Sequence, residues 1–384
     1  MPGCFLAKTD IRDAFRLIPI HPKDRHLLGF KLEDKFYYDC CLPMGCSSAC
    51  QIFERVSDAL IYILRKEYNI HNIVKYLDDF LFIAETRDLC QHSLNCFLRL
   101  ANKLGFPIAE QKTEGPSRSL SFLGYTLDTV VMQLSIPGEK ILKYSQEVRV
   151  LIAKKCATLR EIKSLIGKLL FVTNVIDQGK CFLRRLINLT IGRSNPIAKI
   201  PITNETKEDL ALWLVFLRDY NGIYLIRSPD YYASRTCELI TDSSKIAYAG
   251  VYGSKYICGV FPDSWQCLSI QVLELYPIFL LIVIFAKQLA DHKVIFKCDN
   301  QSVVNLINKQ SSKCKTIMKL LRPMILAMLK YRIAFKSVHI KGKENTLCDG
   351  LSRLQNIPEL RVRYGLERYP TQVPHWLRPQ NWRI

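Results

Sequence analysis

Two adjacent carboxylates, Asp78 and Asp79, are the first residues of this chain whose types and spacing could do chemistry. They lie within IVKYLDDFLFIA, residues 73–84, between two β-rich runs of alternating apolar and aromatic residues. This pattern predicts a β-hairpin that presents Asp78 at its turn. Neighbouring carboxylates repel each other unless a cation compensates them, and Mg²⁺ prefers hard oxygen ligands together with substrate phosphates. A lone Asp-Asp pair is more often a solvated turn, so the rest of the chain must decide.

Four further acids lie at predicted strand ends or helix starts between residues 236 and 355. Asp242 and Asp299 each follow a predicted strand, and Glu274 lies near the start of a predicted helix. Asp349 comes after another strand and a loop rich in Gly and Lys. Any one of these acids could be a helix cap or a surface charge, so their meaning depends on their order and surroundings.

Composition and charge favour a globular protein with a polyanionic partner. The 384 residues are 49% hydrophobic and carry a formal net charge of +19, enough chain for two or three domains. Lys and Arg outnumber Asp and Glu by 12 to 5 in residues 126–193 and by 16 to 8 in residues 236–355, whereas residues 1–125 balance at 16 to 15. Solubility alone explains an excess of basic residues but not its concentration in two blocks. This distribution favours two basic regions that bind a polyanion around an acidic metal centre.

The 15 cysteines show no Cys-x-x-Cys spacing, and no secretory signal precedes them. They predict reduced, mostly buried thiols and an intracellular location, either cytoplasmic or nuclear. Cys46, Cys50, His71 and His92 could be metal ligands, but core packing is the favoured interpretation. The longest apolar run, residues 278–286, is too short to cross a bilayer, so no membrane partner is expected.

The first block carries five motifs whose order matches a known family. They are Asp10 with Phe15, Leu-Pro-Met-Gly at 42–45, Tyr-Leu-Asp-Asp at 76–79, Leu-Gly-Phe at 104–106 with Lys112, and Phe-Leu-Gly-Tyr at 122–125. In order and separation these segments resemble the palm of a reverse transcriptase, an α+β fold in which helices cover a sheet. Any one motif alone would be a weak signal, but five in register are a strong one.

The resemblance implies two-metal DNA synthesis on a primer paired with an RNA template. Asp10, Asp78 and Asp79 would be the catalytic residues and would hold two Mg²⁺ or Mn²⁺ ions. Many relatives have Gln where Met44 stands, so the polar contact made there is absent or replaced. Because only nine residues precede Asp10, the fingers strands of the family are expected to be missing from this chain.

The same resemblance implies contacts to the nucleotide and the primer. Phe15 would crowd a ribose 2′-hydroxyl and so select dNTPs, with core packing as its alternative. Gly45 would let the backbone approach the nucleotide, and Lys112 would meet the triphosphate, although a lone surface lysine is usually only solvated. The hairpin that grips the primer would consist of Phe122, Leu123, Gly124 and Tyr125.

The block after the palm resembles a helical thumb. Thr158 and Glu161 form a capping-box pattern that opens a helix with an apolar stripe. Lys163 and Lys168 on this helix are expected to hold the primer–template backbone, with a solvated basic face as the alternative. The runs LIGKL and FLRRL look most like those of tyrosine-recombinase (DIRS-like) retrotransposons.

The third block resembles an RNase H domain, because its acids follow the family order Asp, Glu, Asp, Asp. Asp242, Glu274, Asp299 and Asp349 would be catalytic and would hold two metal ions, which position a water against the RNA strand of an RNA–DNA hybrid. His339 precedes Asp349 by ten residues and is left outside the site. An acid-free basic run is expected to neutralise hybrid phosphates: Lys309, Lys313, Lys315, Lys319 and Arg322.

The sequence thus predicts a retroelement reverse transcriptase–RNase H fragment. Its expected parts are a palm (1–125), a helical thumb (126–193), a connection (194–235), a mixed α/β RNase H-like domain (236–355) and a tail or linker (356–384). Hybrid cleavage is the activity expected to survive the missing fingers, and a recombinase or integrase is an expected polyprotein neighbour. The alternative is an inactive or domesticated relic that only binds nucleic acid.

Overall fold

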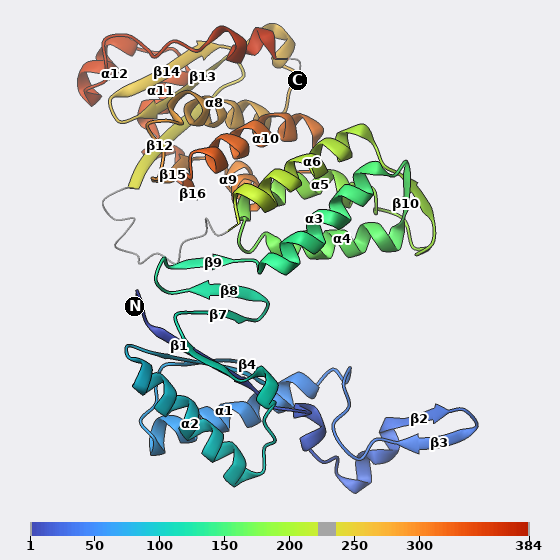
Figure 1. Ribbon diagram of the computed structural model, residues 1–384. Helices are drawn as coiled ribbons and strands as arrows, with labels where there is room; N and C mark the ends of the chain where they lie inside the picture. Colours follow the sequence, from blue (N-terminus) through green and yellow to red (C-terminus); the bar gives the residue numbers. More distant parts are fainter. Residues whose placement is uncertain (1, 222–235, 383–384) are drawn as a thin grey trace. The chain divides into compact units, whose positions relative to one another are not determined.

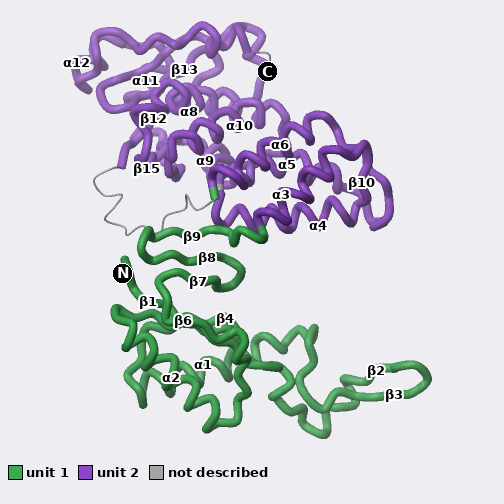
Figure 2. Tube along the Cα trace, in the orientation of Figure 1, with its two compact units in different colours: residues 1–140, 221–226 green, residues 141–220, 227–384 purple. Residues whose placement is uncertain are grey.

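The structure is a computed structural model that describes residues 2–221 and 236–382 and divides into two compact units (Figures 1 and 2). Unit 1 comprises residues 2–140 with Asn221, and unit 2 comprises residues 141–220 and 236–382. Both units combine helices and strands, which confirms the predicted α+β class. Part of the predicted connection, residues 222–235, lies outside the described residues.

Unit 1 is built on an antiparallel sheet of order β4-β5-β1-β6. Its elements are β1 (Phe5–Asp10), β2 (Gly29–Leu32), β3 (Lys35–Tyr38), α1 (Ala49–Glu67), β4 (Ile73–Tyr76), β5 (Asp79–Ala84), α2 (Arg87–Leu104), β6 (Glu114–Ser117), β7 (Ser119–Phe122), β8 (Tyr125–Asp128) and β9 (Gln133–Ser135). The helices α1 and α2 each bury one apolar stripe in the core of this sheet, where Phe97 contacts Phe80 and Phe82 and Phe53 belongs to the same buried cluster. The strands β7-β8-β9 form a second sheet, and β2-β3 a separate hairpin.

The predicted acidic hairpin is present as β4–β5. Tyr76 pairs with Asp79, which leaves Leu77 and Asp78 as the two turn residues. Leu77 adopts a left-handed conformation with φ of 54°, which tight hairpin turns need but which is uncommon for a leucine. The hydrophobic alternation of the flanking strands therefore fixes the register and places Asp78 at the tip.

Unit 2 joins a helical part to a second sheet. Its elements are α3 (Gly138–Ala153, whose first turn belongs to unit 1), β10 (Cys156–Thr158), α4 (Leu159–Val172), α5 (Arg184–Asn188), β11 (Lys199–Pro201), α6 (Asn204–Asp219), β12 (Thr236–Ser243), β13 (Ala247–Tyr252), β14 (Lys255–Val260), α8 (Ile270–Phe285), β15 (Lys293–Cys298), α9 (Gln301–Lys309), α10 (Lys315–Lys330), β16 (Ala334–His339), α11 (Thr346–Ser352) and α12 (Ile357–Tyr364). The sheet order is β14-β13-β12-β15-β16, in which β12, β15 and β16 run parallel.

The capping box predicted at the start of α4 is confirmed. Thr158 Oγ1 accepts from the backbone N–H of Glu161 at 3.2 Å, and Glu161 accepts from the backbone N–H of Thr158 at 2.7 Å. Lys154 also donates to Glu161 at 2.5 Å. These bonds, first of all the one from Lys154, lower the pKa of Glu161 to about 2.

We expect Thr158→Ala to lower the free energy of unfolding by about 1 kcal/mol, because it removes the N-cap acceptor. Glu161→Gln should cost less than about 1 kcal/mol, since its carboxylate is 44% exposed. The folded pKa of Glu161 lies below its unfolded value, so its contribution is present near neutral pH and is lost as the pH falls from about 4 to about 2. Urea unfolding of both variants at pH 7 and pH 3 measures these free energies, and Glu139→Gln, at an exposed position, is the control. If the difference in free energy of unfolding between the parent and Glu161→Gln were the same at pH 7 and pH 3, the predicted pH dependence would be contradicted.

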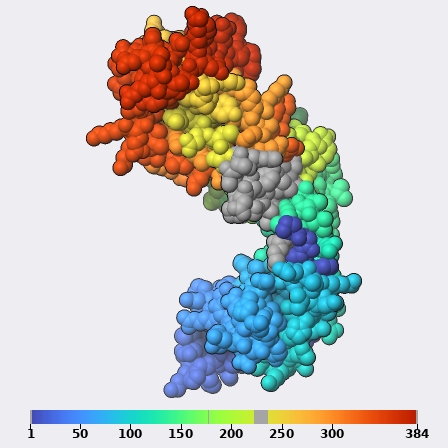
Figure 3. Space-filling model, turned by 90° about the vertical axis from the view of Figure 1, so that its left-hand side faces the viewer, coloured from blue at the N-terminus to red at the C-terminus, as the bar shows by residue number. Residues whose placement is uncertain are grey.

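The C-terminal segment differs from the tail or linker expected over 356–384. It forms α12 and then packs on the sheet and on α8: Thr371 donates its N–H to the carbonyl of Tyr256 at 2.7 Å, and the hydroxyl of Tyr276 donates to the carbonyl of Leu377 at 2.7 Å. Figure 3 shows these dark red residues lying over the orange and yellow part of unit 2. The physical reason is that α8 is apolar on all sides and needs a cover that the sheet and α10 do not complete.

Leu377→Ala should therefore lower the stability of unit 2 by about 2–5 kcal/mol, since Leu377 is fully buried. The neighbouring Trp376 is 63% exposed and supplies a matched control, Trp376→Ala, for which we expect a change within about 0.5 kcal/mol. Chemical denaturation of both variants measures the difference. A loss of stability from Leu377→Ala as small as that from Trp376→Ala would mean that the segment is a loosely attached tail.

All 15 cysteines are free thiols, but only some are buried. Cys50 on α1, His71 in the connection before β4 and His92 on α2 are all exposed, so the core packing expected for them is wrong. The two helical residues face away from the core of unit 1, and His71 lies on a surface connection. They do not join Cys46 in a metal-ligating group within the described residues. Every helix in the described part of the chain is too short or too polar to cross a bilayer.

Candidate active sites

The first carboxylate centre lies where β1 ends beside the β4–β5 turn. Asp10 is the last residue of β1 and pairs with Asp79 across the sheet, and Asp10 is buried. The backbone N–H of Ile11 donates to the carbonyl of Asp78 at 3.1 Å, which ties the turn to the end of β1. The structure thus brings together all three acids that the sequence singles out in this block.

The pKa values of Asp78 and Asp79 are both raised. Partial burial, followed by the charges of Asp10 and Asp78, raises the pKa of Asp79 to about 6. Burial first and then Asp10 raise the pKa of Asp78. Lys112 donates to Asp10 Oδ2 at 2.8 Å, and this bond raises the pKa of the lysine. Lys112 is therefore the counter-charge of the centre, where the sequence predicts either a triphosphate contact or a solvated side chain.

Of the two other predicted nucleotide contacts in unit 1, Phe15 lies on a short 3-10 helix (Ala14–Leu17) and Gly45 on a turn. Phe15 is half-buried and packs edge-on against Phe53 with ring centroids 5.6 Å apart, so the core-packing alternative holds for part of its surface. Gly45 is exposed with φ of 92°, a conformation that favours glycine. A Cβ at this position would meet no atom within 4 Å, so the backbone there is open to approach.

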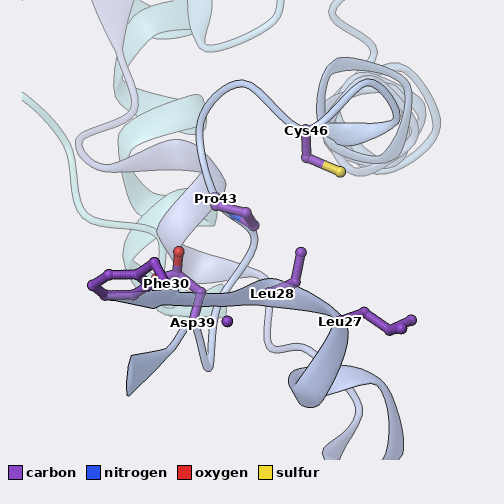
Figure 4. Close-up of a pocket in the computed structure, with 7 residues that line it drawn as sticks. Leu27, Leu28, Phe30, Asp39, Pro43 and Cys46 are labelled. Carbon is purple, nitrogen blue, oxygen red and sulfur yellow. The ribbon is translucent and has the colours of Figure 1, made fainter. Parts of the chain in front are cut away.

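A surface hollow of about 550 Å³ adjoins the loop that carries Gly45 (Figure 4). Pro43 and Cys46 line it from this loop, and Leu28 and Phe30 line it from β2 and the turn before it. Its one lining acid is Asp39, which Arg16 already pairs at 2.5 Å. The hollow is therefore a separate feature from the carboxylate centre.

The predicted primer-gripping hairpin is present as β7–β8. Phe122 pairs with Tyr125, and Leu123 and Gly124 form the turn with φ of 48° and 81°, as in a type I′ hairpin. Phe122 is buried in a small core with β1, while Leu123 is 40% exposed. Lys140 donates to the carbonyl of Gly124 at 3.2 Å, so the turn is held from the start of α3.

The basic residues predicted to bind nucleic acid divide into two kinds. Lys163 is exposed on α4, whereas Lys168 is paired with Glu147 at 2.5 Å. Lys309, Lys313 and Lys315 are exposed, as is Lys319. Arg322 is different: it is mostly buried, lies over the ring of Phe182 at 4.6 Å and pairs with buried Asp209, so its predicted phosphate contact is wrong.

The second carboxylate centre lies at the ends of β12 and β15. Asp242 and Glu274 are buried, and Asp299 and Asp349 are half-buried. Ligand atoms of Glu274, Cys298 and Asp299 all lie within 4.8 Å of one another, the one such metal-ligating group among the described residues. Asp242 is brought to the same place by the parallel pairing of β12 with β15, because the carboxyl ends of these two strands share one edge of the sheet.

Electrostatics link all four acids. Burial, followed by the charges of Asp242 and Asp299, raises the pKa of Glu274 to about 9. Burial also raises the pKa of Asp242, with further contributions from Asp299 and Asp349. Such mutual repulsion is relieved by a bound dication, and oxygen donors are what Mg²⁺ or Mn²⁺ prefers, so these residues fit the predicted ions. Burial also raises the pKa of Cys298, which keeps it a thiol beside the centre.

Several neighbours of this centre were not identified by the sequence analysis. Ser352 donates to Asp242 Oδ2, and Arg353 donates to Asp349 Oδ1 at 2.8 Å. Both follow Asp349 in the run Asp-Gly-Leu-Ser-Arg, so their spacing on one helix was the available signal. His339, left outside the site, has its Nε2 3.0 Å from the carbonyl oxygen of Asp299.

Comparison with known proteins agrees with the geometry of unit 1. Residues 2–127 match the family of reverse transcriptase (RNA-dependent DNA polymerase). The resemblance predicted from the palm motifs is confirmed over this part of the chain. The Gag-Pro-Pol polyprotein of mouse mammary tumor virus is 24% identical over 211 residues, which cover 53% of this chain and 11% of that polyprotein. The chain thus spans about a tenth of this curated relative.

Two solved structures share the fold over most of the chain. A foamy viral protease–reverse transcriptase (dRH) in complex with double-stranded DNA is 17% identical, with a TM-score of 0.50, over 88% of this chain and 57% of that one. The foamy viral protease–reverse transcriptase in complex with an RNA/DNA hybrid is 16% identical, also with a TM-score of 0.50, over 96% of this chain and 47% of that one. At this identity the likeness concerns the fold alone.

Proposed function

We propose that this chain is a reverse transcriptase–RNase H segment of a retroelement polyprotein. Unit 1 would carry RNA-directed DNA synthesis, and the second carboxylate centre would hydrolyse the RNA strand of an RNA–DNA hybrid. The observation that carries the cleavage half is that Glu274 of α8 and Asp299, just after β15, lie within ligand distance of each other and of Cys298, while the charge of buried Asp242 at the end of β12 acts on Glu274. Burying acids that repel one another lowers the stability of the fold, and such clusters occur mainly at functional sites.

Each residue of the two centres has a proposed role. Asp10, Asp78 and Asp79 would hold two Mg²⁺ or Mn²⁺ ions in unit 1, and the four acids of the second centre would hold two more. When bound, such ions activate the attacking oxygen and stabilise the leaving group. Lys112 would neutralise Asp10 before the substrate arrives. Primer, template and dNTPs would meet the exposed turn of β7–β8 and the loop at Gly45.

The finer assignments are proposals of the same kind. The palm, thumb, connection and RNase H-like divisions would fall near residues 125, 193 and 235, and the nearest retroelement class would be the DIRS-like one. The second candidate function, a relic that binds nucleic acid without catalysis, is favoured by the net charge of +19 alone. The many free thiols favour an intracellular site of action.

Two assays on one preparation test the proposal. The first follows cleavage of a labelled RNA–DNA hybrid in Mg²⁺ or Mn²⁺, and the second follows extension of a DNA primer on an RNA template. Asp78→Asn should abolish extension and leave cleavage intact, because the two centres are on different units. Hybrid binding without either activity would support the relic instead.

A further inference from the structure

Three serines connect the elements that carry the acids of the second centre. Ser243 ends β12 and donates to the carbonyl of Leu273 at 2.9 Å, directly before Glu274. The hydroxyl of Ser244 donates to the carbonyl of Ser352 at 3.1 Å. Ser352, at the end of α11, donates to Asp242 Oδ2. Each of β12, α8 and α11 is thus tied to another through a serine hydroxyl.

Ser352 holds the central place among these ties. It is fully buried, and its hydroxyl oxygen lies near two acceptors, Asp242 Oδ2 and the carbonyl of Asp349 at 3.0 Å. A hydroxyl has one hydrogen, and a bond to a carboxylate is stronger than one to a neutral carbonyl. The carboxylate of Asp242 is therefore the favoured acceptor, and Oδ1 is left to face other ligands.

The geometry points to Ser352 as a positioning residue that fixes the Asp242 carboxylate in the orientation needed to bind a divalent cation. This inference rests on the proposed function of the second centre. Ser352 does not touch the reacting atoms; it restricts rotation of Asp242 and locks α11, and with it Asp349, to the end of β12. Groups that hydrogen-bond a ligating carboxylate in this way typically change metal affinity or activity by about 10- to 100-fold when removed.

The test measures Mn²⁺ binding by electron paramagnetic resonance in the full chain carrying Asp78→Asn and Asp79→Asn, so that unit 1 contributes little. In this background Ser352→Ala should raise the dissociation constant for Mn²⁺ about 10- to 100-fold and slow hybrid cleavage at low Mg²⁺. Ser352→Thr, which retains the hydroxyl, should restore binding. Ser352→Cys has a side chain of similar shape, but its thiol is a weak donor, so this variant should bind Mn²⁺ as weakly as Ser352→Ala. It serves as the test if Ser352→Ala does not fold.

Ser337→Ala is the matched control, because Ser337 is a buried serine of the same unit whose hydroxyl has no hydrogen-bond partner among the described residues. We expect parental Mn²⁺ binding from it. The inference is overturned if Ser352→Ala or Ser352→Cys binds Mn²⁺ like the parent, if Ser337→Ala weakens binding equally, or if the parent binds no Mn²⁺. A parent that binds Mn²⁺ without cleaving hybrid would refute the proposed function, and the binding difference between variants would still test Ser352.

Discussion

Asp299→Asn is expected to reduce hybrid cleavage by about 100-fold or more while it makes the metal-free protein more stable. The loss follows because one ligand of a metal centre supplies several kcal/mol of transition-state stabilisation. The gain follows because the charge of Asp299 raises the pKa of buried Asp242, so its removal relieves repulsion of that carboxylate. A gain of about 1 kcal/mol corresponds to one pKa unit of interaction.

Urea unfolding in EDTA and hybrid cleavage in Mg²⁺ measure the two effects on the same preparations. Asp263→Asn is the matched control, since Asp263 is an exposed aspartate of unit 2 outside the centre. It should leave cleavage unchanged and stability within about 0.5 kcal/mol. If Asp299→Asn lost cleavage only because the protein became less stable, Asp299 would be a structural residue and the metal-centre interpretation would fail.

Asp209→Asn is expected to lower the free energy of unfolding of unit 2 by about 3–5 kcal/mol. Asp209 on α6 is 1% exposed, and it pairs with Arg322 of α10 and, at 3.1 Å, with Arg185 of α5. Removing one partner of a buried pair leaves the other charges buried without compensation. Burial raises the pKa of Asp209 in spite of the two guanidinium groups, so desolvation is the larger effect.

A double replacement of Asp209 and Arg322 measures how much of this loss comes from leaving one charge of the pair buried alone. Asp209→Leu combined with Arg322→Met should lose much less stability than the sum of the single changes, because neither charge of that pair then remains buried. Asp219→Asn, at the exposed end of the same helix and paired with Arg218, should cost at most about 1 kcal/mol. Additive losses in the double variant would contradict this account of how α6 is held to α10.

Local signals in the sequence were sufficient for much of the structure. The β4–β5 hairpin, the capping box of α4 and the β7–β8 turn each depend on residues a few positions apart, so alternation, caps and turn chemistry predict them. The acids of the second centre were found because they lie at predicted strand ends and helix starts in the order of a known family, and parallel strands bring the strand ends together. The outcome at Asp242 and Asp299 follows directly from this rule.

Contacts between distant residues were not predictable in the same way. Arg322 pairs with Asp209 across 113 residues, Ser352 with Asp242 across 110, and Lys112 with Asp10 across 102. Nothing in a basic run distinguishes the one arginine that is buried from the lysines that stay exposed. The C-terminal segment was misjudged for a related reason: its prolines and tryptophans predict a linker until the apolar surface of α8 is seen to need a cover.

The most direct test of the central claim is the rate at which the purified chain cuts the RNA strand of an RNA–DNA hybrid in Mg²⁺, compared with single-stranded RNA and a DNA duplex of the same sequence. The account predicts cleavage of the hybrid RNA alone, which EDTA and Asp299→Asn both abolish. Hybrid bound but left intact, or cleavage that survives Asp299→Asn, would contradict the assignment of the second carboxylate centre as a hybrid-specific nuclease.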